Sequence, residues 1–216
     1  TDAEIIGLRG GEARVFDPVV LPGSTEVVFN LQVAGQVWEL ALTGDLVGDA
    51  RDEMILTRTT SEGGSIERLE VYGLNASGTG WDQLRSESFG APWVSLSAGD
   101  VDADGKDELV AARRADNRLL IWDPGNNWNT LHNATYSFPW LEVEVANTHD
   151  PSAGDNSGRS EIVALRTGVE SSLASYLVFR CCDGASLTTV ASDIFFPNFF
   201  NAAAGDVNSS GDAEVF

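Results

Sequence analysis

The sequence predicts an all-β protein built from four repeats of about 53 residues, each holding four short antiparallel strands. Three observations lead to this prediction. An acidic residue followed by aliphatic residues recurs at a steady interval, an aromatic residue stands seven residues before each acidic loop, and no segment shows sustained helical periodicity. The recurring glutamates are Glu4, Glu53, Glu108, Glu161 and Glu214, so the intervals between them are 49, 55, 53 and 53 residues.

Each repeat is expected to begin with the strand that carries the aromatic residue. This strand would lie innermost, and its aromatic side chain would pack against the neighbouring repeat, with sugar stacking as the alternative role. A proline stands directly before two of the aromatic residues. The aromatic residues are Trp38, Trp93, Trp140 and Phe199, which precede Asp45, Asp100, Asn147 and Asp206.

The remaining strands of each repeat follow its acidic loop. After the loop that begins at Asp100, an aliphatic run at 109–113 is followed by a polar turn at 115–117 and a second apolar run at 118–122. The alternating run at 26–32 and the β-branched run at 187–191 predict further strands. Tandem four-stranded units of about 40–55 residues are typical of β-propeller blades, whose radial packing covers most sheet edges.

We interpret residues 1–216 as a single propeller domain or a fragment of one. The chain contains four periods and one further copy of the strand that follows the acidic loop, whereas a closed ring of four blades needs only four such strands. We therefore expect it to belong to a larger propeller of seven or eight blades, or to assemble with further copies. The repeats lie at approximately 1–36, 37–91, 92–138, 139–196 and 197–216.

Composition narrows the classes of function. The chain has 33 acidic and 13 basic residues and a formal net charge of −20, so it cannot hold a nucleic-acid backbone by counterion release. No apolar stretch approaches the roughly 18 residues of a membrane span, which argues against direct membrane insertion. No phosphate-binding glycine loop and no nucleophile–base pair is evident, so the chain is predicted not to be an enzyme. For Cys181 and Cys182 we expect two thiols on opposite faces of a strand, with a strained vicinal disulfide as the alternative.

The segment from Asp100 to Glu108 carries the clearest pattern of metal-ligating residues. Counted from Asp100, oxygen-bearing side chains stand at positions 1, 3, 5 and 9, and a glycine at position 6 allows a tight turn. The carbonyl of position 7 would be a further ligand. Hard oxygen ligands in a flexible loop favour Ca²⁺, whereas the alternative is a solvated acidic turn. Position 12 is Ala111, so the loop is not an EF-hand. The predicted calcium ligands are Asp100, Asp102, Asp104, Lys106 and Glu108.

Three other copies of the loop carry weaker ligand sets. The copy that begins at Asp45 has Val47 at position 3 and Ala50 where the glycine belongs. The copy that begins at Asp206 has oxygen donors throughout but less charge, and the copy that begins at Asn147 is stretched. Their candidate calcium ligands are Asp45, Asp49 and Glu53 in the first copy, Asp206, Asn208, Ser210, Asp212 and Glu214 in the second, and Asp150, Asp155, Ser157 and Glu161 in the stretched copy.

The segment from Phe89-Gly90-Ala91-Pro92 to Leu109 resembles an FG-GAP repeat, and VCBS-type repeats are similar. These repeats are the calcium-bearing blades of integrin α-chain-like β-propellers. The resemblance covers the whole chain in phase, although only the copy at Asp100 matches the pattern closely and two copies depart from it at ligand positions. It implies a secreted or cell-surface propeller, usually of seven blades, with calcium in loops on one rim.

The sequence thus predicts a non-catalytic extracellular calcium-binding module for adhesion, protein–protein binding or surface assembly, with a protein or glycan partner at the cell surface. A first alternative is a calcium-dependent lectin, in which Trp81, Trp128 or Tyr136 stacks on sugar rings. A second alternative is a propeller-type polysaccharide lyase, which would need a basic residue that faces an acidic sugar. The scarcity of basic residues disfavours the lyase.

Overall fold

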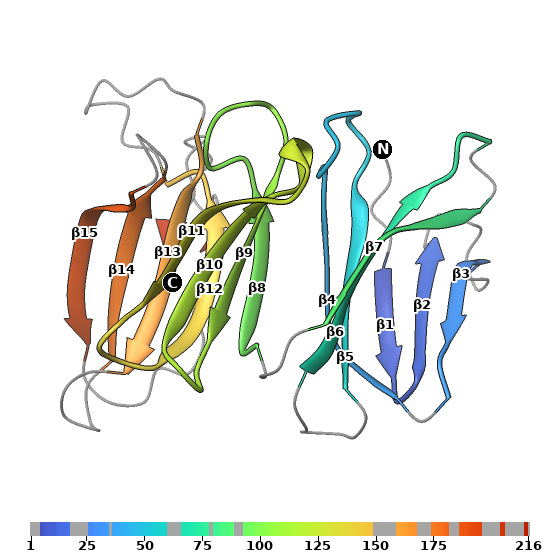
Figure 1. The fold of residues 1–216 in the computed structure, drawn as a ribbon, viewed down its shortest axis with the longest axis horizontal. Helices are drawn as coiled ribbons and strands as arrows, with labels where there is room; N and C mark the ends of the chain where they lie inside the picture. Colours follow the sequence, from blue (N-terminus) through green and yellow to red (C-terminus); the bar gives the residue numbers. More distant parts are fainter. Residues whose placement is uncertain are drawn as a thin grey trace. The chain divides into compact units, whose positions relative to one another are not determined.

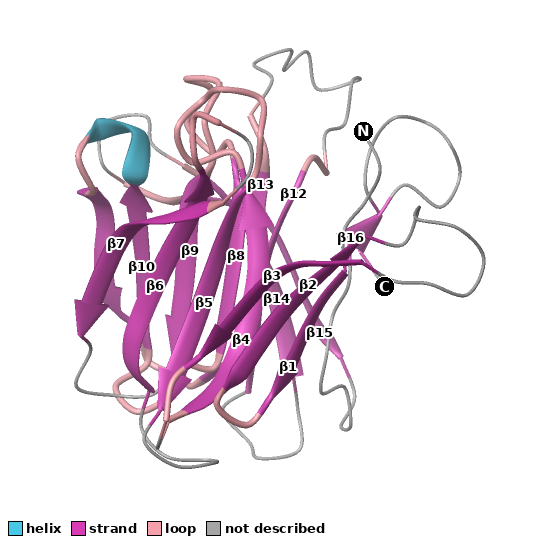
Figure 2. Cartoon of the chain, turned by 90° about the vertical axis from the view of Figure 1, so that its right-hand side faces the viewer, coloured by secondary structure: helices cyan, strands magenta, loops and turns pink. Residues whose placement is uncertain are grey.

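The structure is a computed structural model, and most of the elements it describes are β-strands. In the described part of the chain the one helix is the 3-10 helix η1 (Pro124–Asn126), and no helix there is long and apolar enough to cross a membrane (Figure 2). The described residues are 5–17, 26–34, 36–59, 66–77, 80–88, 93–148, 159–167, 174–181, 186–195, 204–205 and 214–215.

The chain divides into two compact units, of which the first comprises residues 1–43 and 52–92. This unit consists of a three-stranded sheet in the order β1-β2-β3 and a four-stranded sheet in the order β4-β5-β6-β7. The strands β1, β2 and β3 pair antiparallel, and so do β5, β6 and β7. The strand β3 covers the same residues that the alternating pattern predicted. The strands are β1 (Ile5–Arg9), β2 (Glu12–Asp17) and β3 (Glu26–Gln32), then β4 (Val37–Gly44), β5 (Glu53–Thr59), β6 (Ile66–Leu74) and β7 (Trp81–Ser88).

The second unit comprises residues 44–51 and 93–216 and contains two four-stranded antiparallel sheets and a pair of short strands (Figure 1). Each four-stranded sheet follows the order of the chain, which is the order of a propeller blade. The strands are β8 (Ser95–Gly99), β9 (Glu108–Arg113), β10 (Arg118–Asp123) and β11 (Asn129–Thr135), then β12 (Trp140–Ala146), β13 (Glu161–Thr167), β14 (Ala174–Arg180) and β15 (Thr188–Phe195), then β16 (Ala204–Gly205) and β17 (Glu214–Val215).

The recurring tryptophans are core residues, as the sequence predicted. Trp38, Trp93 and Trp140 are 3%, 4% and 0% exposed. In the second unit, the indole N–H of Trp140 donates to the carbonyl of Asn117, in the turn between β9 and β10. In the first unit, the indole N–H of Trp38 donates to the carbonyl of Gly11, in the turn between β1 and β2. One contact therefore recurs: the first strand of a sheet is fixed to a turn of the sheet before it.

In the second unit, side chains also join the first strands of the two sheets. The hydroxyl of Ser95 on β8 donates to the carbonyl of Val143 on β12 at 3.1 Å, and the backbone N–H of Val145 donates to the hydroxyl of Ser97 at 2.9 Å. Behind them, Trp140, Phe179 and Leu119 belong to one buried apolar cluster. The strand β8, which ends where the Asp100 loop begins, is therefore packed against β12.

Cys181 contradicts the expectation of two free thiols. It is disulfide-bonded and 1% exposed, and it follows directly on β14 within the apolar cluster of the second unit. The sequence contains one other cysteine, its neighbour Cys182. Alternation along a strand suggested that neighbouring thiols would point apart, but that rule holds only within a strand, and β14 ends at Arg180.

Candidate metal centre

The loop between β8 and β9 is shaped by the carboxylate of its first residue. Oδ1 of Asp100 accepts a hydrogen bond from the N–H of Ala103 at 2.7 Å, and Oδ2 accepts one from the N–H of Gly105 at 3.0 Å. Ala103 and Gly105 both have positive φ angles, +66° and +85°, which turn the chain around the carboxylate. The predicted glycine therefore stands where the backbone needs it.

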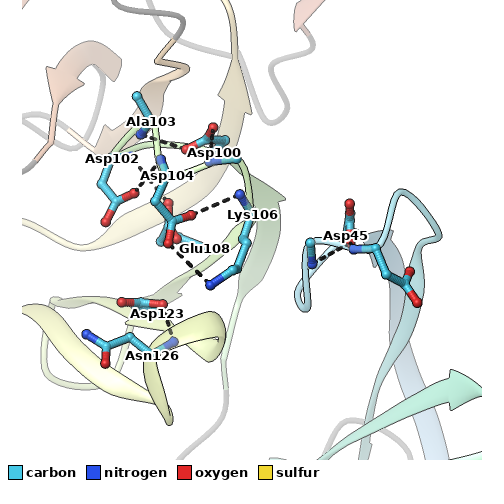
Figure 3. A network of polar contacts seen from close by, with 12 residues as sticks. Asp45, Asp100, Asp102, Ala103, Asp104, Lys106, Glu108, Asp123 and Asn126 are labelled. Carbon is cyan, nitrogen blue, oxygen red and sulfur yellow. Dashed lines mark hydrogen bonds and ion pairs between the residues drawn. The ribbon is translucent and has the colours of Figure 1, made fainter.

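Three of the predicted ligands come together in this loop. Asp100, Asp102 and Glu108 each place one carboxylate oxygen so that the three oxygens lie within 4.8 Å of one another. Figure 3 shows their side chains gathered at the loop. Among the described residues, no other group of three His, Cys, Asp or Glu side chains meets this condition. Carboxylates this close repel one another unless a proton or a cation lies between them.

Glu108 is the innermost of the three. It is 0% exposed, and its Oε2 accepts hydrogen bonds from the N–H groups of Val101 at 2.9 Å and Asp102 at 3.3 Å. Its Oε1 is buried without any hydrogen-bond partner. Burial raises the pKa of Glu108 to about 8, and the nearby charges of Asp102 and Asp100 add to that rise. A buried oxygen without a partner, beside two further carboxylates, is suited to a cation.

The carboxylate of Asp104 is not one of this group of three, and it contacts Lys106. Oδ1 of Asp104 accepts a hydrogen bond from the N–H of Lys106 at 2.9 Å, and its Oδ2 lies 3.6 Å from Nζ of the same lysine (Figure 3). The pKa of Asp102 is raised, first by burial and then by the charge of Asp104. The lysine ammonium therefore balances part of the negative charge at the exposed side of the loop.

Asp123 is an acidic residue near the loop that is not among the predicted ligands. It ends β10 and is 3% exposed, and its Oδ1 accepts a hydrogen bond from the N–H of Asn126 at 2.7 Å, which caps η1 (Figure 3). Its charge contributes to the raised pKa of Asp102. The signal that could have found it is the run Asp123-Pro124-Gly125, which is typical of a turn whose first residue caps the backbone.

The loop that begins at Asp45 repeats the backbone of the first loop with different side chains. Oδ1 of Asp45 accepts from the N–H groups of Gly48 and Asp49 at 2.8 and 3.0 Å, and Oδ2 accepts from the N–H of Ala50 at 2.8 Å. Gly48 and Ala50 have positive φ angles of +77° and +61°. Asp49 forms an ion pair with Arg51, which lowers the pKa of that carboxyl. Val47, at position 3, is 46% exposed.

Three further predicted ligands, Glu53, Glu161 and Glu214, are the first residues of β5, β13 and β17, and the rest lie outside the described residues. Glu53 is 4% exposed. Glu161 is 3% exposed, and its carboxylate accepts from the N–H and the hydroxyl of Thr148 and from Arg180. Glu214 lies on β17. The candidates outside the described residues are Asp150, Asp155, Ser157, Asp206, Asn208, Ser210 and Asp212.

Two of the aromatic residues considered for sugar stacking pack against other rings. Trp81 meets Phe29 at a centroid distance of 5.5 Å and an interplanar angle of 69°. Tyr136 meets Trp140 at 4.9 Å and 70°, and its hydroxyl lies 3.1 Å from Nε2 of His132. Part of each ring is therefore used in packing.

No protein-family model matches the chain, and no curated protein sequence matches it. Among solved structures, the chain is similar to Sqt1 of Saccharomyces cerevisiae, with 11% sequence identity, a TM-score of 0.47 and 92% of this chain covered. It is also similar to the WD40 domain of SCAP from fission yeast, with 16% identity, a TM-score of 0.49 and 96% of this chain covered. The chain spans 60% and 51% of the length of those two chains.

Proposed function

We propose that the loop from Asp100 to Glu108 binds Ca²⁺ through the carboxylates of Asp100, Asp102 and Glu108. The observation that carries this proposal is the buried Oε1 of Glu108, which has no partner and lies beside two further carboxylates. Three converging carboxylate oxygens in a glycine-containing loop match the hard ligands and the irregular geometry that Ca²⁺ accepts. Asp104 and the carbonyl of Lys106 are the further ligands expected from the spacing of the loop.

The role proposed for this site is structural support of a non-catalytic, calcium-binding propeller module of the FG-GAP and VCBS type. The repeated four-stranded sheets and the loop between the first and second strand of a sheet are the features that support it. A cation there would tie the end of β8 to the start of β9 and so make the rim of the sheet rigid. The proposed setting is extracellular, within a propeller of seven or eight blades, and the partner is a protein or a glycan.

Calorimetric titration with Ca²⁺, together with thermal unfolding in Ca²⁺ and in EGTA, tests the site. We expect binding and a higher unfolding temperature in Ca²⁺, because a ligand of the folded state alone stabilises that state by about 2.7 kcal/mol at a hundred times its Kd. Glu108→Gln is the matched control. The amide keeps an acceptor for the N–H groups of Val101 and Asp102 and removes the charge. Equal unfolding temperatures of the wild type in saturating Ca²⁺ and in EGTA would refute the proposal.

A further inference from the structure

Asp107 lies between two predicted calcium ligands and contacts a different loop. Its backbone N–H donates to the carbonyl of Asp45 at 2.9 Å, and its Oδ2 accepts from the backbone N–H of Asp45 at 2.9 Å. The two residues are 62 positions apart in the sequence. This reciprocal pair of bonds fixes Asp45, the second residue of the segment 44–51, which belongs to the second unit together with the loop at Asp100.

Close packing surrounds this pair of hydrogen bonds. Leu46 is 1% exposed. A Cβ at Gly44 would lie 2.7 Å from Cβ of Ala98 and 2.9 Å from Oδ2 of Asp107, so this position has room only for glycine. A Cβ at Gly48 would lie 2.8 Å from Cγ of Lys106, so the lysine stem rests on the segment 44–51. The two residues that precede Glu108, Lys106 and Asp107, therefore both contact this segment.

A related contact occurs one repeat further along the chain. The N–H of Ser160, which stands directly before Glu161, donates to the carbonyl of Asp100 at 2.7 Å. Asp107 stands directly before Glu108 and donates to the carbonyl of Asp45 in the same way. The backbone bond therefore recurs, whereas the bond from the N–H of Asp45 to a side chain depends on Asp107.

We propose that Asp107 is a positioning residue that transmits calcium binding at the Asp100 loop to the segment 44–51. The inference rests on the proposed calcium site. A cation held by the carbonyl of Lys106 and the carboxylate of Glu108 fixes the backbone on both sides of Asp107. Asp107 then holds Asp45, whose carboxylate in turn accepts the N–H groups of Gly48, Asp49 and Ala50. The segment 44–51 thus becomes ordered without binding a cation of its own.

Hydrogen exchange measured by mass spectrometry on peptides that cover 45–51 tests this coupling, with Ca²⁺ itself as the probe. In the wild type, we expect saturating Ca²⁺ to slow exchange in these peptides about tenfold relative to EGTA, because local opening becomes rarer. Asp107→Ala should bind Ca²⁺ within about threefold of the wild-type Kd, since Asp107 is not a ligand, and should lose the slowing. Asp107→Asn should restore it, because an amide oxygen can accept from the N–H of Asp45.

Two controls separate the possible failures. Glu108→Gln should abolish the Ca²⁺-dependent slowing at 45–51, and if slowing persists there, the segment binds the cation directly and the coupling is wrong. Trypsin cleavage after Arg51, whose side chain is 53% exposed, gives a second readout should Asp107→Ala fold poorly. In the wild type and in Asp107→Asn, Ca²⁺ should protect this bond. If Ca²⁺ binds but protects neither the bond after Arg51 nor the amides of 45–51, the coupling is wrong and the proposed site stands. If Ca²⁺ does not bind, the proposed site is wrong as well.

Discussion

The loops that begin at Asp45 and Asp100 share a backbone conformation and differ in the side chains that would meet a cation. In both, the first aspartate accepts N–H groups from positions 4 and 6, and both of those positions have positive φ angles. At position 3, one loop has the exposed Val47 and the other has the half-buried Asp102. At position 5 the two loops are alike, because Asp49 forms an ion pair with Arg51 and Asp104 forms one with Lys106.

The shape of the loop and its proposed affinity for Ca²⁺ have different causes. The Asp45 loop adopts its conformation with a valine at position 3, so a carboxylate at that position is not needed to form the turn. What distinguishes the Asp100 loop is a second carboxylate at position 3 and the unpartnered oxygen of Glu108. The difference between a turn and a metal site therefore lies in side chains on a common backbone.

The largest expected effect comes from Asp102→Val, which gives the Asp100 loop the side chain of its counterpart. We expect the Ca²⁺ affinity to fall about a hundredfold or more, because one of three converging carboxylates is lost. Stability in EGTA should change by less than about 0.5 kcal/mol. The bonds that Asp100 accepts remain, and the loss of the bond from the N–H of Asp104 to Oδ1 of Asp102 is offset by weaker repulsion with Glu108. Calorimetric titration and urea unfolding measure the two quantities. Retention of wild-type affinity would show that Asp102 is not a ligand.

Asp45→Ala should have the next largest effect, and an effect of a different kind. The carboxylate of Asp45 accepts three backbone N–H groups, so its removal should lower the free energy of unfolding by about 2 kcal/mol. The loss should already appear in EGTA, because these bonds form without a cation in this loop, and in Ca²⁺ the lost coupling through Asp107 should add to it. Urea unfolding under both conditions measures it. A loss confined to Ca²⁺ would mean that Asp45 binds the cation, and the contrast between the loops would then fail.

Much of the fold could be predicted because the repeat leaves a strong signal in the sequence. The aliphatic runs that start at Glu53, Glu108 and Glu161 form β5, β9 and β13. Trp38 and Trp140 lie on the first strands of their sheets, whereas Trp93 stands two residues before β8 and Phe199 lies outside the described residues. The division into two compact units could not be predicted. It depends on packing between residues far apart in the chain, including the association of 44–51 with the later repeats, and no local pattern encodes that packing.

The candidate site could be predicted only in part. Alternate spacing identified Asp100, Asp102 and Glu108, since side chains at such positions can turn to one side of a tight loop. Ala50 stands where the pattern has glycine, yet it has the positive φ angle that the turn needs, and a glycine, Gly48, stands at position 4 of that loop. Asp107 gave no signal as a contact of Asp45, because a bond across 62 residues cannot be derived from spacing within one loop.

The smallest expected effects come from exchanging alanine and glycine between the two loops. Gly105 has φ +85°, and a Cβ at this position would have no atom within 4 Å. In Gly105→Ala only the left-handed backbone conformation is therefore unfavourable, and the protein should be destabilised by about 1 kcal/mol. Ala50 has φ +61°, so Ala50→Gly relieves the same strain, but it also gives the unfolded chain more freedom, and the net gain should be about 0.5 kcal/mol. Urea midpoints measured in EGTA resolve both changes. If Ala50→Gly instead destabilises the protein by more than about 1 kcal/mol, side-chain packing and not backbone strain governs position 6, and the loops differ in more than their ligands.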